Sequence, residues 1–221
     1  FTKEASCALD HAIGIAQRSG DHILLVHILN EESREQMKKE GLTEELVNEK
    51  LDEIGKAASA KFGLNITFEV REGSIFSTFG EVAKEKEARL IVMGTHGVVG
   101  IKQSLFGAHA LKIAESSPVP VIIVQNKSIA PKGYETIVFP VDTGNELEIK
   151  SKAAAELAKF FRAEIHLFVA NPNVDDEGRK KIKRNVEMAA QTFRNTGVNF
   201  KEVSDEATAV WPGYAKQTIK Y

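Results

Sequence analysis

Three glycines in the middle of the chain have a spacing that could bind an anion through the main chain. Gly94, Gly97 and Gly107 follow the pattern G-x2-G-x9-G, and the first of them ends an apolar run over residues 90–93. A helical pattern then extends over residues 104–115. Glycine lets the backbone approach a phosphate closely, and the first N–H groups of a helix are free to bind it, so this combination predicts an anion site. The competing interpretation is a loop that only turns the chain between strand and helix.

The spacing differs from two common phosphate-binding signatures. It has neither the Gly-Lys-Ser/Thr of a P-loop nor the GxGxxG of a dinucleotide site. It resembles the nucleotide-binding loop of the universal stress protein family, in which G-x2-G-x9-G is followed by Ser or Thr. The resemblance extends over nearly the whole chain, in two copies. Ala108 stands at the hydroxyl position, so a bound phosphate would lose a donor worth on the order of 1 kcal/mol.

The elements around the loop alternate between strands and helices. Periodicity predicts helices over residues 3–19, 43–62 and 75–87, and strands over residues 22–29, 64–70, 90–93 and 119–124. Residues 30–41 are polar and charged, which indicates a loop or a mobile helix. Such alternation is typical of parallel strands joined by right-handed crossovers. Ligands of these sheets bind beyond the carboxyl ends of the strands, and Gly94 lies just past such an end.

The pattern restarts in the second half of the chain. We expect strands over residues 136–141, 163–170 and 198–203, helices over residues 146–161 and 177–196, and a further helix over residues 211–221. An offset of 142 residues aligns Ile23 and Leu25 with Ile165 and Leu167. The same offset places the equivalent of Asp142 just before Phe1, so an opening strand is expected upstream of residue 1. The expected units are residues 1–126 and 134–221, with a linker at 127–133 and a second copy that is truncated.

The family resemblance implies an α/β fold: an open parallel five-stranded sheet of order 3-2-1-4-5 with helices on both faces, repeated twice. It implies a cytoplasmic stress-response module that binds ATP or AMP in the first unit, with Mg²⁺ only alongside ATP. Any ATP hydrolysis would be slow, and no residue is assigned to catalysis. The implied site comprises an adenine contact, a ribose contact, the loop and the start of the next helix: Ile28, Met93, Gly94, His96, Gly97, Gly107, Ala108 and His109.

Two other functions remain open from the residues. The first is a scaffold of the same fold without nucleotide, which dimerises through the edge strand at residues 119–124 or between the two repeats; Ala108 favours it. The second is an adenylate-forming ligase, which is disfavoured because neither His-Ile-Gly-His nor Ser-Gly-Gly-x-Asp-Ser occurs.

Bulk properties limit the partners. The net charge of −2 gives no global attraction to nucleic acid. No apolar run approaches the roughly 20 residues of a membrane span. The single cysteine, Cys7, cannot form a disulfide within the chain, and the histidines show no metal-ligand spacing.

Several polar residues have two interpretations each. Arg71 and Lys102 are either phosphate contacts or solvated surface residues. Asp142 is either the strand-end aspartate of the family or a helix N-cap. The basic run at residues 179–184 indicates a solvated helix face, with an RNA or membrane patch as the alternative.

Overall fold

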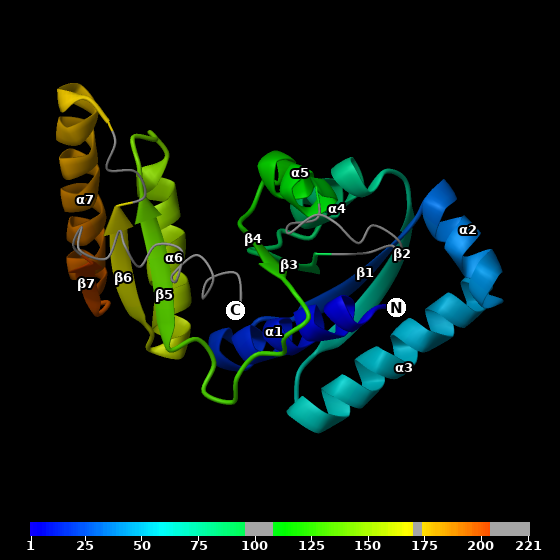
Figure 1. The fold of residues 1–221 in the computed structure, drawn as a ribbon. Helices are drawn as coiled ribbons and strands as arrows, with labels where there is room; N and C mark the ends of the chain where they lie inside the picture. Colours follow the sequence, from blue (N-terminus) through cyan, green and yellow to red (C-terminus); the bar gives the residue numbers. More distant parts are fainter. Residues whose placement is uncertain (96–107, 170–173, 204–221) are drawn as a thin grey trace. The chain divides into compact units, whose positions relative to one another are not determined.

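A computed structural model describes residues 1–95, 108–169 and 174–203 (Figure 1). The chain divides into two compact units, Phe1–Ile129 and Ala130–Tyr221, each described here by itself. The division falls inside the segment that the sequence predicts as a linker. The expected helix over residues 211–221 lies outside the described residues.

The first unit alternates helices and strands, as its periodicity predicts. Its elements are α1 (Lys3–Ser19), β1 (Ile23–Leu29), α2 (Glu31–Glu40), α3 (Glu44–Phe62), β2 (Ile66–Glu72), α4 (Ile75–Glu85), β3 (Ile91–Gly94), α5 (Ala108–Ser116) and β4 (Val121–Val124). Local caps set the helix ends: the Thr2 side chain accepts from the N–H of Ala5, and Gly20 ends α1 in the left-handed conformation.

The polar segment after β1 is a helix rather than a loop. Asn30 accepts from the N–H of Ser33 at 2.8 Å, and the Ser33 hydroxyl accepts from the N–H of Asn30 at 2.7 Å. This reciprocal capping box satisfies two N–H groups that the first turn of α2 would otherwise leave without partners. Composition alone left this segment undecided, because α2 buries only Met37.

The strands of the first unit form two parallel pairs, β1 with β2 and β3 with β4. The expected single sheet of five strands is therefore not observed among the described residues. Instead, α1 packs against both pairs. Ile13 and Ala16 of α1 join a cluster with Ile23 of β1, whereas Cys7 and Ala8 join a cluster with the end of β4. Both faces of α1 are apolar at these positions, so the helix connects two sheets that share no hydrogen-bond ladder here.

The segment after β4 is bound to α1. The Cys7 Sγ lies 3.8 Å from the Ser128 hydroxyl, and the His11 Nε2 lies 3.0 Å from the carbonyl oxygen of Lys127. Ile129 packs so closely on Gly14 that a methyl group there would lie 3.0 Å from its Cδ1. The first residues of the expected linker are thus held on the first unit.

The second unit contains β5 (Thr136–Val141), α6 (Leu147–Phe161), β6 (Glu164–Val169), α7 (Asp176–Thr196) and β7 (Phe200–Val203). Its three described strands form one parallel sheet in the order β5-β6-β7. Helices α6 and α7 pack against each other and against the sheet. Phe193 of α7 and Ile165 of β6 are 0% exposed at the centre of this core.

No helix in the described part of the chain combines the length and apolarity needed to cross a bilayer.

Candidate functional site

The candidate site lies at the edge where β3 and β4 end. The two strands are parallel, and Gly94 is opposite Val124 in the register. The N–H of the next residue, Thr95, donates to the carbonyl oxygen of Val124 at 2.9 Å, and Thr95 is buried. The connection from this edge leads to α5, which begins at Ala108. His96, Gly97 and Gly107 belong to that connection and lie outside the described residues.

Gly94 is in close contact with the first turn of α1. A Cβ atom at this position would lie 2.8 Å from the Cβ of Glu4 and 3.0 Å from its carbonyl carbon. Distances below 3 Å to backbone-anchored atoms require a shift of the helix. The structure therefore gives Gly94 a packing role that does not depend on a ligand, and Glu4 occupies the space beside it. The sequence predicted α1 but gave no signal that its first turn approaches the end of β3.

The other predicted contacts are distributed over different elements. Met93 is half-buried and lies opposite Ile123 on β4. Ile28 is buried and lies opposite Arg71, in the separate β1–β2 pair. No hydrogen-bond ladder in the described part of the chain joins that pair to β3. Ala108 and His109 are the first two residues of α5, and the N–H groups of a first helical turn have no acceptor within their own helix.

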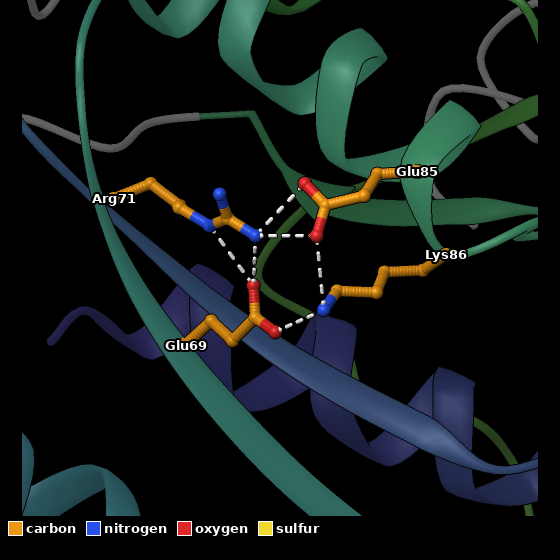
Figure 2. Close-up of polar contacts among 4 residues, drawn as sticks. All are labelled: Glu69, Arg71, Glu85 and Lys86. Atoms are coloured by element: carbon orange, nitrogen blue, oxygen red, sulfur yellow. Dashed lines mark hydrogen bonds and ion pairs between the residues drawn. The ribbon is translucent and has the colours of Figure 1, made fainter.

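Arg71 belongs to a four-residue ion-pair network rather than to a free surface (Figure 2). Its Nη2 lies 2.8 Å from a carboxylate oxygen of Glu69 and 2.8 Å from one of Glu85. Lys86 completes the network, with its Nζ 2.5 Å from Glu69 and 3.1 Å from Glu85. Lys86 and Arg71 lower the pKa of both carboxyl groups, mainly by hydrogen bonding to the charged form. The guanidinium of Arg71 is thus engaged by two carboxylates, which disfavours the phosphate interpretation. Lys102 lies outside the described residues.

Asp142 closes a turn at the end of β5. Its Oδ1 accepts from the N–H of Gly144 at 2.7 Å, whereas the N-cap of α6 is Glu146, which makes no side-chain cap. The N-cap interpretation of Asp142 was therefore wrong. Asn185 of α7 fixes the turn by donating to the carbonyl oxygens of Asp142 at 2.8 Å and Gly144 at 3.0 Å. Because Asn185 lies 43 residues away, no local pattern indicated this contact.

Two histidines place a ring nitrogen in the interior without a hydrogen bond, His27 through Nε2 and His166 through Nδ1. Burial lowers the pKa of His27. The other nitrogen of His166 lies 2.7 Å from Glu164. Within the described ranges, no three His, Cys, Asp or Glu side chains are grouped so that they could hold a metal ion.

Comparisons with known proteins show which family the chain resembles. The model of the "Universal stress protein family" matches residues 1–125. A universal stress protein of Methanocaldococcus jannaschii is 31% identical over 125 residues, which cover 53% of this chain and 73% of that protein. A universal stress protein structure from Archaeoglobus fulgidus has a TM-score of 0.58 at 17% identity, covering 97% of this chain and 78% of its own. A protein of Pseudomonas aeruginosa described as a putative universal stress protein has a TM-score of 0.58 at 17% identity, covering 95% and 73%. At such identities the structures show likeness of fold alone.

Proposed function

The chain belongs to the universal stress protein family, and from that premise we propose that its first unit binds an adenine nucleotide, ATP or AMP, as part of a regulatory module. The observation that carries this proposal is the connection from Gly94 to Ala108. It starts at the shared carboxyl edge of two parallel strands, contains the glycine spacing, and ends at a helix start. Ligands of open α/β sheets bind at such an edge.

In this proposal the phosphates are bound by main-chain N–H groups of the loop and of residues 108 and 109. Ile28 contacts the adenine and Met93 borders the ribose. Mg²⁺ enters only with ATP. We assign no catalytic residue, and any hydrolysis is slow. The two units are proposed to be repeats of one five-stranded design of order 3-2-1-4-5, acting in the cytoplasm.

The first experiment measures nucleotide binding directly. The purified protein is denatured and its supernatant is chromatographed, and the stripped protein is then titrated with ATP and AMP by calorimetry. Gly97→Val and Gly107→Val should each weaken binding more than tenfold, because a side chain blocks the approach of the phosphate to the backbone. Gly55→Ala in α3 is the matched control, since its new methyl would meet its nearest neighbour at an ordinary 3.6 Å. Unchanged affinity in both valine variants would contradict the proposal.

A second variant tests the missing hydroxyl. Ala108→Ser restores the donor that the family pattern carries at this position. One added hydrogen bond is worth about 1 kcal/mol, so the affinity should rise about fivefold for ATP. No change in affinity would mean that residue 108 does not face a phosphate.

The alternative is a scaffold of the same fold without a nucleotide. Two observations favour it: Gly94 is explained by its contact with Glu4, and Ala108 lacks the hydroxyl. In this reading β4, which has one ladder partner among the described strands, pairs with β4 of a second copy. Sedimentation of Ile123→Lys tests it, because a charge on that strand should dissociate such a dimer. A nucleotide-free protein that shows no thermal shift with millimolar ATP would favour the scaffold.

A further inference from the structure

The exposed face of α7 carries positive charges around an apolar side chain. Lys180, Lys183 and Arg184 are exposed there, next to Met188, which is 41% exposed. An open surface along this face is lined by Lys180, Lys183, Arg184, Glu187, Met188 and Gln191. Glu187 is paired with Arg194, and the more N-terminal Arg179 is paired with Asp176. By contrast, the three lining cations make no ion pair with any residue in the described ranges. We call this surface the basic stripe.

The exposed face of α3 carries the opposite arrangement. Glu45, Glu49 and Glu53 follow one another at intervals of four residues, and all three are exposed. Leu46, which is 41% exposed, lies beside them. Glu49 and Glu53 also make no ion pair within the described residues. We call this surface the acidic stripe.

Each stripe places like charges four residues apart on its own helix. Side chains four residues apart are neighbours on a helix, and like charges at that spacing repel. The acidic stripe contains two such pairs, Glu45 with Glu49 and Glu49 with Glu53, and the basic stripe contains Lys180 with Arg184. An opposite charge brought against each stripe would relieve this repulsion.

We propose that the acidic stripe of one copy of this chain docks, antiparallel, on the basic stripe of a second copy. The spacings agree. With Leu46 placed against Met188, Glu49 and Glu53 lie roughly 4.5 and 10.5 Å farther along α3, at a rise of about 1.5 Å per residue. Arg184 and Lys180 lie roughly 6 and 12 Å from Met188 in the opposite chain direction. Each carboxylate therefore faces one cation, within the reach of flexible side chains.

The apolar residues select a second copy over other anionic partners. The exposed large hydrophobic residues of the described ranges are Phe1, Leu46, Ile149 and Met188. Two of these four lie at the ends of the complementary stripes, where they would cover each other. RNA or an anionic bilayer would match the basic stripe but would leave the acidic stripe and Leu46 without a role. A second copy matches both, and every copy carries both surfaces.

The test is a charge swap followed by sedimentation velocity on the full chain, stripped of nucleotide. The wild-type chain should associate with increasing concentration at low ionic strength and less so in high salt, because exposed charges are screened. The paired variant Glu49→Lys with Glu53→Lys should weaken association at least tenfold, and so should Lys180→Glu with Arg184→Glu. An equimolar mixture of the two variants should associate again, since each reversed stripe then meets a reversed partner.

The matched control is Lys3→Glu with Lys152→Glu, which changes the net charge as much as the basic-stripe variant does but at exposed positions on α1 and α6. Its association should equal that of the wild type. A wild-type chain that stays monomeric at all concentrations would overturn the proposal. So would wild-type association in both charge-swap variants, or an equimolar mixture of the two variants that does not associate. Since nucleotide is absent throughout, these outcomes are independent of the proposed nucleotide site.

Discussion

In the second unit the three described strands form one ladder, whereas in the first unit four described strands form two pairs with α1 packed against both. Among the described residues, more large side chains are completely buried in the second unit than in the first. Phe193, Ile165 and Val141 of the second unit are 0% exposed, and in the first unit Val47 reaches the same burial. A continuous sheet lets α6 and α7 cover a common aromatic core. The first unit instead depends on how closely one helix approaches the strand ends.

This contrast indicates where each unit is vulnerable. The second unit should be sensitive to the loss of core volume, because its large side chains pack against one another. The first unit should be sensitive to added volume where the first turn of α1 meets Gly94, because a methyl group there would overlap Glu4.

The largest effect is expected for Phe193→Ala. The centroid of the Phe193 ring lies 5.5 Å from that of Phe139, in an edge-on arrangement, and 5.7 Å from that of Phe200, whose ring is tilted. Removing a buried phenyl group should cost about 3–5 kcal/mol of unfolding free energy. Urea denaturation followed by hydrogen exchange should show this loss in the second unit. Lys183→Ala, exposed on the same helix, should change the free energy by less than about 0.5 kcal/mol. Equal loss of protection in both units would remove the distinction between them.

The next largest effect is expected for Gly94→Ala in the first unit. The new methyl would overlap Glu4 at 2.8 Å, so α1 must move, at a cost of about 1–3 kcal/mol. Gly55→Ala should be neutral or stabilising by up to about 1 kcal/mol, because alanine favours the helix and space exists there. Chemical denaturation of both variants makes the comparison. Wild-type stability in Gly94→Ala would mean that α1 does not hold this position in solution.

A pH effect of about 2–3 kcal/mol is expected for the second unit in alkali. Burial raises the pKa of Tyr134 to about 12, and its ring packs on Phe161 at 4.6 Å. The folded state therefore binds the proton of the Tyr134 hydroxyl more tightly than the unfolded chain does, because the pKa of tyrosine in an unfolded chain is about 10. The stabilisation is present below pH 10 or so and is lost as pH rises toward 12. Tyr134→Phe should remove this dependence, as measured by denaturation midpoints along a pH series. A wild-type profile that parallels the variant would show Tyr134 to be solvated.

The smallest effect is expected in acid, at the network of Figure 2. Lys86 and Arg71 lower the pKa of Glu69 from its usual 4.5. A depressed folded pKa gives stability that is present above about pH 4.5 and is lost as pH falls through the lowered value. Because these side chains are 26–50% exposed, solvent screens the contribution. Glu69→Gln should reduce the acid sensitivity of the first unit without abolishing it. A steeper acid loss in Glu69→Gln than in wild type would reverse the assigned sign.

Much of the fold could be predicted because its signals are local. Periodicity located α1, α3 and α7 within one or two residues, and Gly20 and Thr43 marked helix ends through the conformations and caps that these residues favour. The sequence left open whether residues 30–41 form a helix or a loop. A capping box starts the helix there, but the polar composition of the segment is also typical of a loop. The candidate site was predicted as a loop position, but nothing near Gly94 in the sequence shows that Glu4 lies against it.

By itself, the sequence determined the alternation of strands and helices, the glycine spacing after β3 and the resemblance to one family, since each of these is encoded in neighbouring residues. Only the tertiary structure decided that Gly94 contacts Glu4, that Arg71 is engaged by Glu69 and Glu85, and that α1 links two strand pairs. These contacts join elements far apart along the chain. They depend on which faces the helices present to the sheets, and that choice is made by packing the whole unit.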